Sequence, residues 1–218
     1  MTTLAELRTR ARSRADMPGT NFITNAEIDV WINEGIQRIH DKLVEAYAGD
    51  YMESKSDFTT DGTAGITLPA DFYKLLGVDL QWHGQLRTLK PYQLNERNIV
   101  NRTDMQAAVP RYKLSGGFRL YIYPTQPNNT SGTVWYVPSA QRLTVDADYV
   151  LFPNGWEKYA IVYAAVQMLT KEESETSALR QLLLEWDTEL SQAAENRNSG
   201  IQKTAVDTDL DNWYFVDF

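Results

Sequence analysis

The spacing of apolar residues changes twice along this chain of 218 residues. Near each end, apolar residues recur every three or four positions, which is the period of a helix with one buried face. Over about a hundred residues between these segments, apolar and polar residues alternate in short runs bounded by glycine, proline and aspartate, as in strands and turns. Because the strands do not alternate with helices, the pattern favours an α+β fold over a parallel Rossmann sheet.

The N-terminal helical segment, Thr3 to Ala48, contains two capping boxes. Thr3 with Glu6 predicts a first helix from about Thr3 to Asp16, and the Met17-Pro18-Gly19 stretch ends it. Thr24 with Glu27 opens a second helix, where Ile23 and Ile28 have the spacing of a hydrophobic staple. The apolar stripe of this helix comprises Ile28, Ile32, Ile36, Ile39, Leu43 and Tyr47, and Gly49 is expected to close it.

The C-terminal helical segment, Asn154 to Asn196, predicts a second helical pair. Asn154 is positioned to cap a third helix that is apolar on nearly every side. A fourth, amphipathic helix is expected from about Glu175, with Leu179, Leu183 and Trp186 on its buried face.

Three hairpins are expected in the middle of the chain. The first joins 58–60 to 66–68 with Phe58 opposite Leu68, and the second joins 74–82 to 86–89. The third spans 111–123 with a loop at 115–117, which sets Leu114 opposite Phe118 and keeps one face apolar. A further strand is expected from Thr133 to Val137.

These elements predict a discontinuous architecture. We expect a helical bundle of residues 1–50 and 153–198, an inserted antiparallel β subdomain of residues 51–152, and an extended C-terminal arm of residues 199–218. The length allows either one sizeable core or a domain with an inserted subdomain, because single cores stop growing only near ~250–300 residues. We expect one domain with an insertion.

Catalytic and metal-binding motifs are scarce. The chain has no cysteine and two histidines, His40 and His83, to which we assign structural roles because neither has a histidine partner at i+4 or a nucleophile elbow. The acidic run at 207–211 lacks the glycine and the closing glutamate of a calcium loop. We therefore expect no cofactor, no metal and no enzymatic activity, although a hydrolase that uses two carboxylates remains an open alternative.

Charge and hydropathy restrict the partners. The 21 basic and 29 acidic residues give a net charge of −8, which repels nucleic-acid backbones and suits a surface that DNA passes without specific binding. No apolar stretch approaches the ~20 residues of a membrane span, and the start of the chain lacks the features of a signal peptide. We expect synthesis in a host cytoplasm and no membrane contact.

Two regions are candidates for binding a protein partner. The first is a basic cluster on the first helix, which comprises Arg8, Arg10, Arg12 and Arg14. Their alternate spacing distributes them around the helix. They can form a solvated face, contact DNA or contact an acidic neighbouring subunit. The C-terminal arm offers aromatic anchors for docking by strand addition or in a groove, or for folding back onto its own sheet. Its candidate residues are Trp213, Tyr214, Phe215 and Phe218, together with the carboxylates Asp209 and Asp211.

Three segments together resemble the head-to-tail adaptor (connector, or head-completion) proteins of tailed bacteriophages: Thr3–Ala48, Leu68–Leu80 with its Pro69-Ala70-Asp71-Phe72 corner, and Gly155–Ala160. The resemblance implies a structural virion protein at the head-tail junction, without cofactors. It implies a ring, usually of twelve subunits, beneath the portal protein, a surface for the tail (nozzle or tail-completion) protein, and C-terminal arms that reach into the portal. The alternatives from other classes are a virion-associated, cell-wall-degrading hydrolase and a terminase or DNA-packaging accessory protein whose first helix reads DNA.

Overall fold

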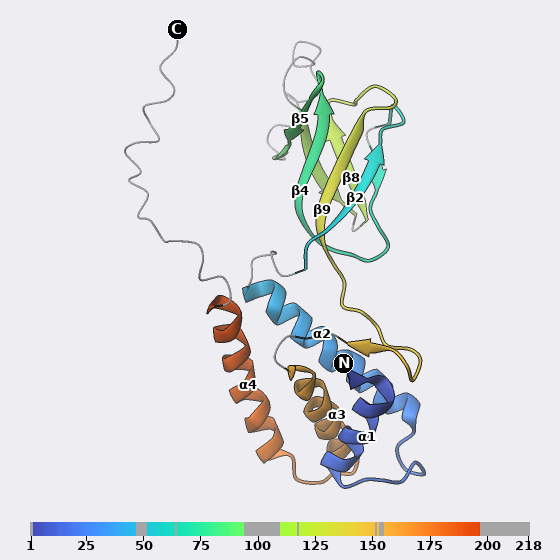
Figure 1. Cartoon of the computed structure of the whole chain (residues 1–218), viewed down its shortest axis with the longest axis vertical. Coiled ribbons are helices and arrows are strands. Elements are labelled where there is room, and N and C mark those ends of the chain that lie inside the picture. Colours follow the sequence, from blue (N-terminus) through green and yellow to red (C-terminus); the bar gives the residue numbers. More distant parts are fainter. Residues whose placement is uncertain are drawn as a thin grey trace, which may run out of the picture.

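The structure is a computed structural model that describes residues 2–46, 52–63, 65–93, 110–116, 118–150, 152 and 155–196. Over these residues the fold is α+β, as predicted, with four helices and mainly antiparallel sheets. The helices lie together in the lower part of Figure 1, and the long strands form a separate body above them. The predicted arm at 199–218 lies outside the described residues.

Both predicted capping boxes are confirmed. Helix α1 (Leu4–Ala15) begins where the Glu6 amide donates to Thr3 Oγ1 at 3.3 Å and the Thr3 amide donates to Glu6 at 3.1 Å. Helix α2 (Asn25–Ala46) begins with the same reciprocal bonds between Thr24 and Glu27, at 3.3 and 2.9 Å. These bonds satisfy amides that the first turn of a helix leaves without intrahelical partners. Tyr47 and Gly49, predicted to end α2, lie outside the described residues.

The predicted cap of helix α3 (Glu157–Lys171) is wrong. The N-cap is Trp156, which makes no side-chain capping bond, and Asn154 lies outside the described residues. The Trp156 side chain is buried in the helical core, so packing fixes the start of α3 in place of a polar cap. The prediction that α3 is nearly buried is confirmed, since every residue from Tyr159 to Val166 is buried.

Helix α3 lies at the centre of the helical core and contacts α1, α2 and α4 (Ser177–Asn196). The α2 stripe faces this core, and Ile28, Ile32, Ile36, Ile39 and Leu43 are all buried. At the crossing of α2 and α3, a side chain at Gly35 would lie 2.8 Å from the Cα atom of Ala160, so only glycine allows the two backbones to approach this closely.

The strands above the helices form two sheets. One has the order β2-β9-β4-β5, with β2 Ser54–Thr59, β9 Ser131–Pro138, β4 Phe72–Trp82 and β5 Gln85–Thr88. The other has the order β3-β8-β7-β6, with β3 Gly65–Thr67, β8 Arg119–Tyr123, β7 Arg111–Ser115 and β6 Lys90–Pro91. Their inner faces share one buried cluster, which makes a two-layer sandwich. The short β6–β7 pair is parallel, unlike the expected antiparallel arrangement.

Of the predicted hairpins, the second is confirmed and the first is wrong. Strands β4 and β5 pair as expected, and His83 and Gly84 form the turn with φ of 50° and 76°. Strands β2 and β3 do not pair with each other. Strand β2 pairs with β9, and β3 pairs with β8 of the other sheet, because the chain crosses between the layers after β2.

The third hairpin forms with a different register. Leu114 faces Leu120, not Phe118, and Tyr112 faces Ile122. The predicted and observed registers differ by two residues, so both place apolar side chains opposite one another and the apolar pattern cannot distinguish them.

A short antiparallel pair joins distant parts of the chain. Strand β1 (Thr2–Thr3) pairs with β10 (Tyr149–Val150), and the Leu4 amide donates to the Asp148 carbonyl at 2.8 Å. The sequence gives no signal for two-residue strands. This pair attaches the start of the chain to the segment that returns from the sandwich to α3.

Candidate interaction site

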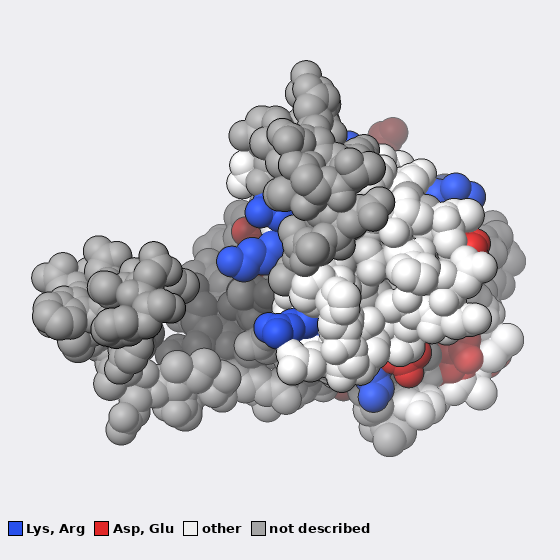
Figure 2. All heavy atoms as spheres, turned by 90° about the horizontal axis from the view of Figure 1, so that it is seen from above, with Lys and Arg blue, Asp and Glu red and all other residues white. Residues whose placement is uncertain are grey.

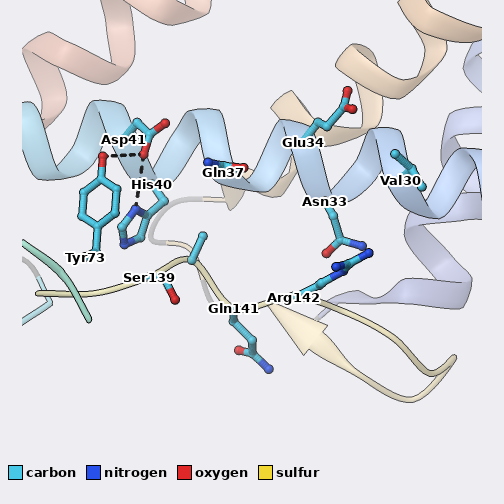
Figure 3. Close-up of a pocket in the computed structure, with 11 residues that line it drawn as sticks. Val30, Asn33, Glu34, Gln37, His40, Asp41, Tyr73, Ser139, Gln141 and Arg142 are labelled. Atoms are coloured by element: carbon cyan, nitrogen blue, oxygen red, sulfur yellow. Dashed lines mark hydrogen bonds and ion pairs between the residues drawn. The ribbon is translucent and has the colours of Figure 1, made fainter. Parts of the chain in front are cut away.

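A pocket of about 310 Å³ lies where the helices meet the sandwich (Figure 3). It lies between the outer side of α2, the start of β4 and the segment 139–142 that leaves β9. Its lining is Val30, Asn33, Glu34, Gln37, His40, Asp41, Tyr73, Ser139, Ala140, Gln141 and Arg142.

Helical periodicity builds one wall of this pocket. The α2 residues of the lining recur every three or four positions, so they share one side of the helix, next to the buried stripe. Asn33 holds the opposite wall: its amide donates to the Leu143 carbonyl at 2.9 Å, and its oxygen accepts from the Leu143 amide at 2.8 Å. The Asn33 side chain thereby pairs with the Leu143 backbone as a neighbouring strand would, and it keeps segment 139–142 beside α2.

At the sandwich end of the pocket, His40, Asp41 and Tyr73 come together. His40 is 1% exposed, and its Nε2 lies 2.9 Å from the Pro138 carbonyl oxygen. Its Nδ1 is buried without a hydrogen-bond partner and lies 3.7 Å from Asp41 Oδ1. The Tyr73 hydroxyl donates to the same carboxylate at 2.8 Å, and this bond raises the pKa of Tyr73. Asp41 is therefore a carboxylate held in place by a neutral donor.

The structure separates the four arginines of α1. Arg12 is buried and donates to the Ile23 carbonyl at 2.7 Å, to Asn25 at 2.9 Å and to the carbonyls of the 17–19 turn. Arg8 bonds both oxygens of Asp29 and also contacts Asp146; the hydrogen bond to Asp29 is the main cause of the raised pKa of Arg8. Arg12 and Arg8 therefore have hydrogen-bond partners within their own chain, and the binding of the four arginines to a partner stays a prediction. Arg10 and Arg14 are exposed.

The family model of the SU10 adaptor protein matches residues 2–209, nearly the whole chain. The chain belongs to the SU10 adaptor protein family. The resemblance to phage head-to-tail adaptors is thus confirmed, and this adaptor is a structural virion protein of the head-tail connector class. A search of curated proteins gives no match. The family is structural, and neither the hydrolase nor the terminase alternative gains support from it.

In the part of this SU10 adaptor that the structure describes, no group of three or more histidine, cysteine, aspartate or glutamate side chains could hold a metal ion. No helix there combines the length and apolarity needed to cross a bilayer. The aromatic anchors and carboxylates of the predicted arm, from Asp209 to Phe218, lie outside the described residues, so their docking role stays a prediction.

The adaptor has a second, larger pocket of about 570 Å³ at the far end of its sandwich. It is lined by the β4–β5 turn, including Trp82 and His83, and by the loop before β9, including Pro124 and Pro127. None of the described residues that line it is Asp, Glu, Lys or Arg. Figure 2 views the molecule from this end and shows a broad face with few charged side chains. Sequence reasoning identified the turn but not the pocket, because the pocket depends on how loops of both sheets meet.

Proposed function

We propose that this protein forms a ring beneath the portal of a phage head and links the portal to the tail. The family match over residues 2–209 carries this proposal. The structure supports it with a helical body and a sandwich that present separate surfaces, so one subunit has room for contacts to neighbours and to a second layer of the particle (Figure 1).

Three surfaces have distinct roles in this proposal. The exposed side of α1 and the polar sides of α2 and α4 face neighbouring subunits, where charges at the rim set the register of the contact more than its affinity. The sandwich, whose far end has few charged side chains among the described residues, faces outward or toward the tail protein. The arm at 199–218 docks on the portal or on a neighbouring subunit, and a ring of about twelve such arms multiplies a weak contact into high avidity.

DNA passes through the centre of the ring without specific binding, since the net charge of −8 disfavours phosphate contacts. The protein performs no catalysis in this role. It is assembled into the virion at the head-tail junction after synthesis in the host cytoplasm.

Mass measurement tests the proposed ring. The protein alone should be monomeric, and mixing it with purified portal rings should give a complex with one adaptor per portal subunit or another fixed ratio. Light scattering after size exclusion, or native mass spectrometry, gives both masses. Failure to bind the portal at micromolar concentration would contradict the proposal.

Truncation tests the arm. Removal of 207–218 should leave the melting temperature of the monomer unchanged and abolish attachment to the portal in a pull-down assay, because the aromatic anchors are lost. Trp213→Ala should weaken attachment less than the truncation does. If the isolated truncated protein melts at a lower temperature than the full chain, the arm packs on its own subunit.

A further inference from the structure

We propose that the pocket at Asp41 receives the guanidinium groups of Arg10 or Arg14 from a second copy of this chain. The inference deepens the proposed ring and rests on it. It assigns one charged contact between neighbouring subunits and states which side of each subunit contributes to it.

Asp41 has unused acceptor capacity. Its side chain is 44% exposed, and among the described residues it accepts one hydrogen bond, from Tyr73, and forms no ion pair with lysine or arginine. Behind it lies the orphan Nδ1 of His40, in a side chain that is 1% exposed. The carboxylate therefore lies at the mouth of the pocket beside a second unsatisfied polar atom, and it can bind a ligand rich in N–H donors.

The matching donors are on α1. Arg10 and Arg14 are four residues apart, so they project from one side of the helix about 6 Å apart along its axis. Both are exposed, and neither forms an ion pair with another described residue. The chain has a net charge of −8, so its acidic residues outnumber its basic ones. These two arginines can therefore pair with an acidic site on another copy.

These donors point away from the pocket of their own subunit. Arg8 faces Asp29 of α2 and Asp146, on the side of the molecule that carries the segment following the pocket. At 100° per residue, Arg10 and Arg14 lie about 200° and 240° around α1 from Arg8. Donor and acceptor surfaces thus face different directions. Contacts between two unlike surfaces of identical subunits close into a ring when the rotation from one subunit to the next divides a full turn evenly.

The pocket suits an arginine side chain better than a metal ion. The described residues provide no cluster that could chelate a metal ion. Arg142 lines the end of the pocket near Val30 and Asn33, far from Asp41 in Figure 3, and repels a cation that enters there. An incoming guanidinium is therefore directed to the Asp41 end, where its planar donors can bond a carboxylate with two oxygens.

Charge exchange tests the contact. Asp41→Lys and the double variant Arg10→Glu/Arg14→Glu each place like charges across every interface and should reduce the rate of ring formation on portal at least tenfold. The triple variant that combines them restores opposite charges and should regain most of that loss. Asp41→Asn keeps an acceptor for Tyr73 and should give a smaller loss. Glu172→Lys and Arg87→Glu serve as exposed controls.

Cross-linking locates the contact. Because the chain has no cysteine, Arg14→Cys/Asp41→Cys should form a ladder of covalent oligomers when portal-bound rings are oxidised or treated with a short bifunctional maleimide. Each single cysteine variant should give no more than dimers. Circular dichroism at each stage checks that the variants are folded.

The outcomes separate this inference from the proposed function. If wild-type protein forms no ring on portal, the proposed function fails and the inference fails with it. If wild-type rings form but the triple variant is as defective as its parents, and no ladder appears, the Asp41 contact is wrong while the ring stands.

Discussion

At the scale of single residues, the arginines of α1 show how identical side chains acquire different roles. Spacing along a helix places Arg12 near the edge of the buried face, but only the path of residues 17–23 supplies the carbonyl oxygens that its guanidinium needs. The sequence could therefore predict that the four arginines point in different directions. It could not predict which of them are structural, because the acceptors belong to an irregular turn.

Arg12→Ala should destabilise the protein by about 2–4 kcal/mol, since it leaves several carbonyl oxygens and Asn25 without a donor in a partly buried site. Arg14→Ala, on the exposed side of the same helix, should change the free energy of unfolding by less than about 0.5 kcal/mol. Urea titrations followed by circular dichroism measure both. Equal losses would mean that the Arg12 bonds contribute no net stability.

Glu27 predicts an acid-sensitive contact between α2 and α3. Lys171 lies 2.6 Å away and, with the Thr24 amide and hydroxyl, lowers the pKa of Glu27 from 4.5 to about 2. Because the folded-state pKa is depressed, this stabilisation is present above the unfolded value and is lost as the pH falls from about 5 to 2. Melting temperatures of Glu27→Gln should decline less over that range than those of wild type, with exposed Glu189→Gln as the control. Parallel curves for Glu27→Gln and wild type would contradict this role.

At the scale of elements, local signals predicted the helices well and the strand partners poorly. Both capping boxes and the α2 stripe are properties of residues within one or two turns of each other. In contrast, β2 and β3 were predicted to pair because a five-residue loop joins them, whereas β9, which lies more than seventy positions from β2, is the actual partner. Pairing between distant strands depends on the arrangement of two whole sheets, which no short window contains.

The crossing of α2 and α3 depends on Gly35. Gly35→Ala should destabilise the protein by about 1–3 kcal/mol, because the added methyl group would meet the backbone of Ala160 at 2.8 Å. Gly19→Ala is the matched control, since nothing lies within 4 Å of a side chain there. Thermal melts compare the two variants. If Gly35→Ala leaves the melting temperature unchanged, the two helices can move apart without loss of stability.

At the scale of the whole molecule, the buried residues form two clusters, one among the helices and one between the sheets. The residues that line the pocket at Asp41 lie at the boundary between the two clusters, where His40 contacts Pro138 and Tyr73 contacts Asp41. The periodicity of the sequence could predict which segments form helices and which form strands. It could not locate the site, because three separate segments supply its lining.

We expect the two bodies to respond separately to core damage. Ile36→Ala should remove about 2–5 kcal/mol of stability and reduce amide protection mainly in the helices, whereas Leu80→Ala should do so mainly in the strands. Hydrogen exchange measured by mass spectrometry reads both patterns from one experiment. Uniform loss of protection in either variant would show that the molecule unfolds as one unit.

The position of α3 at the centre of the helical core has a consequence for synthesis. The apolar stripes of α1 and α2 leave the ribosome long before residues 157–171, their main packing partner, have been translated. All strands of the sandwich lie within 54–138, so this body can complete its sheets first. The apolar faces of α1 and α2 therefore stay exposed on the nascent chain until its last third emerges. The pairing of β10 with β1 then brings α3 close to these two helices.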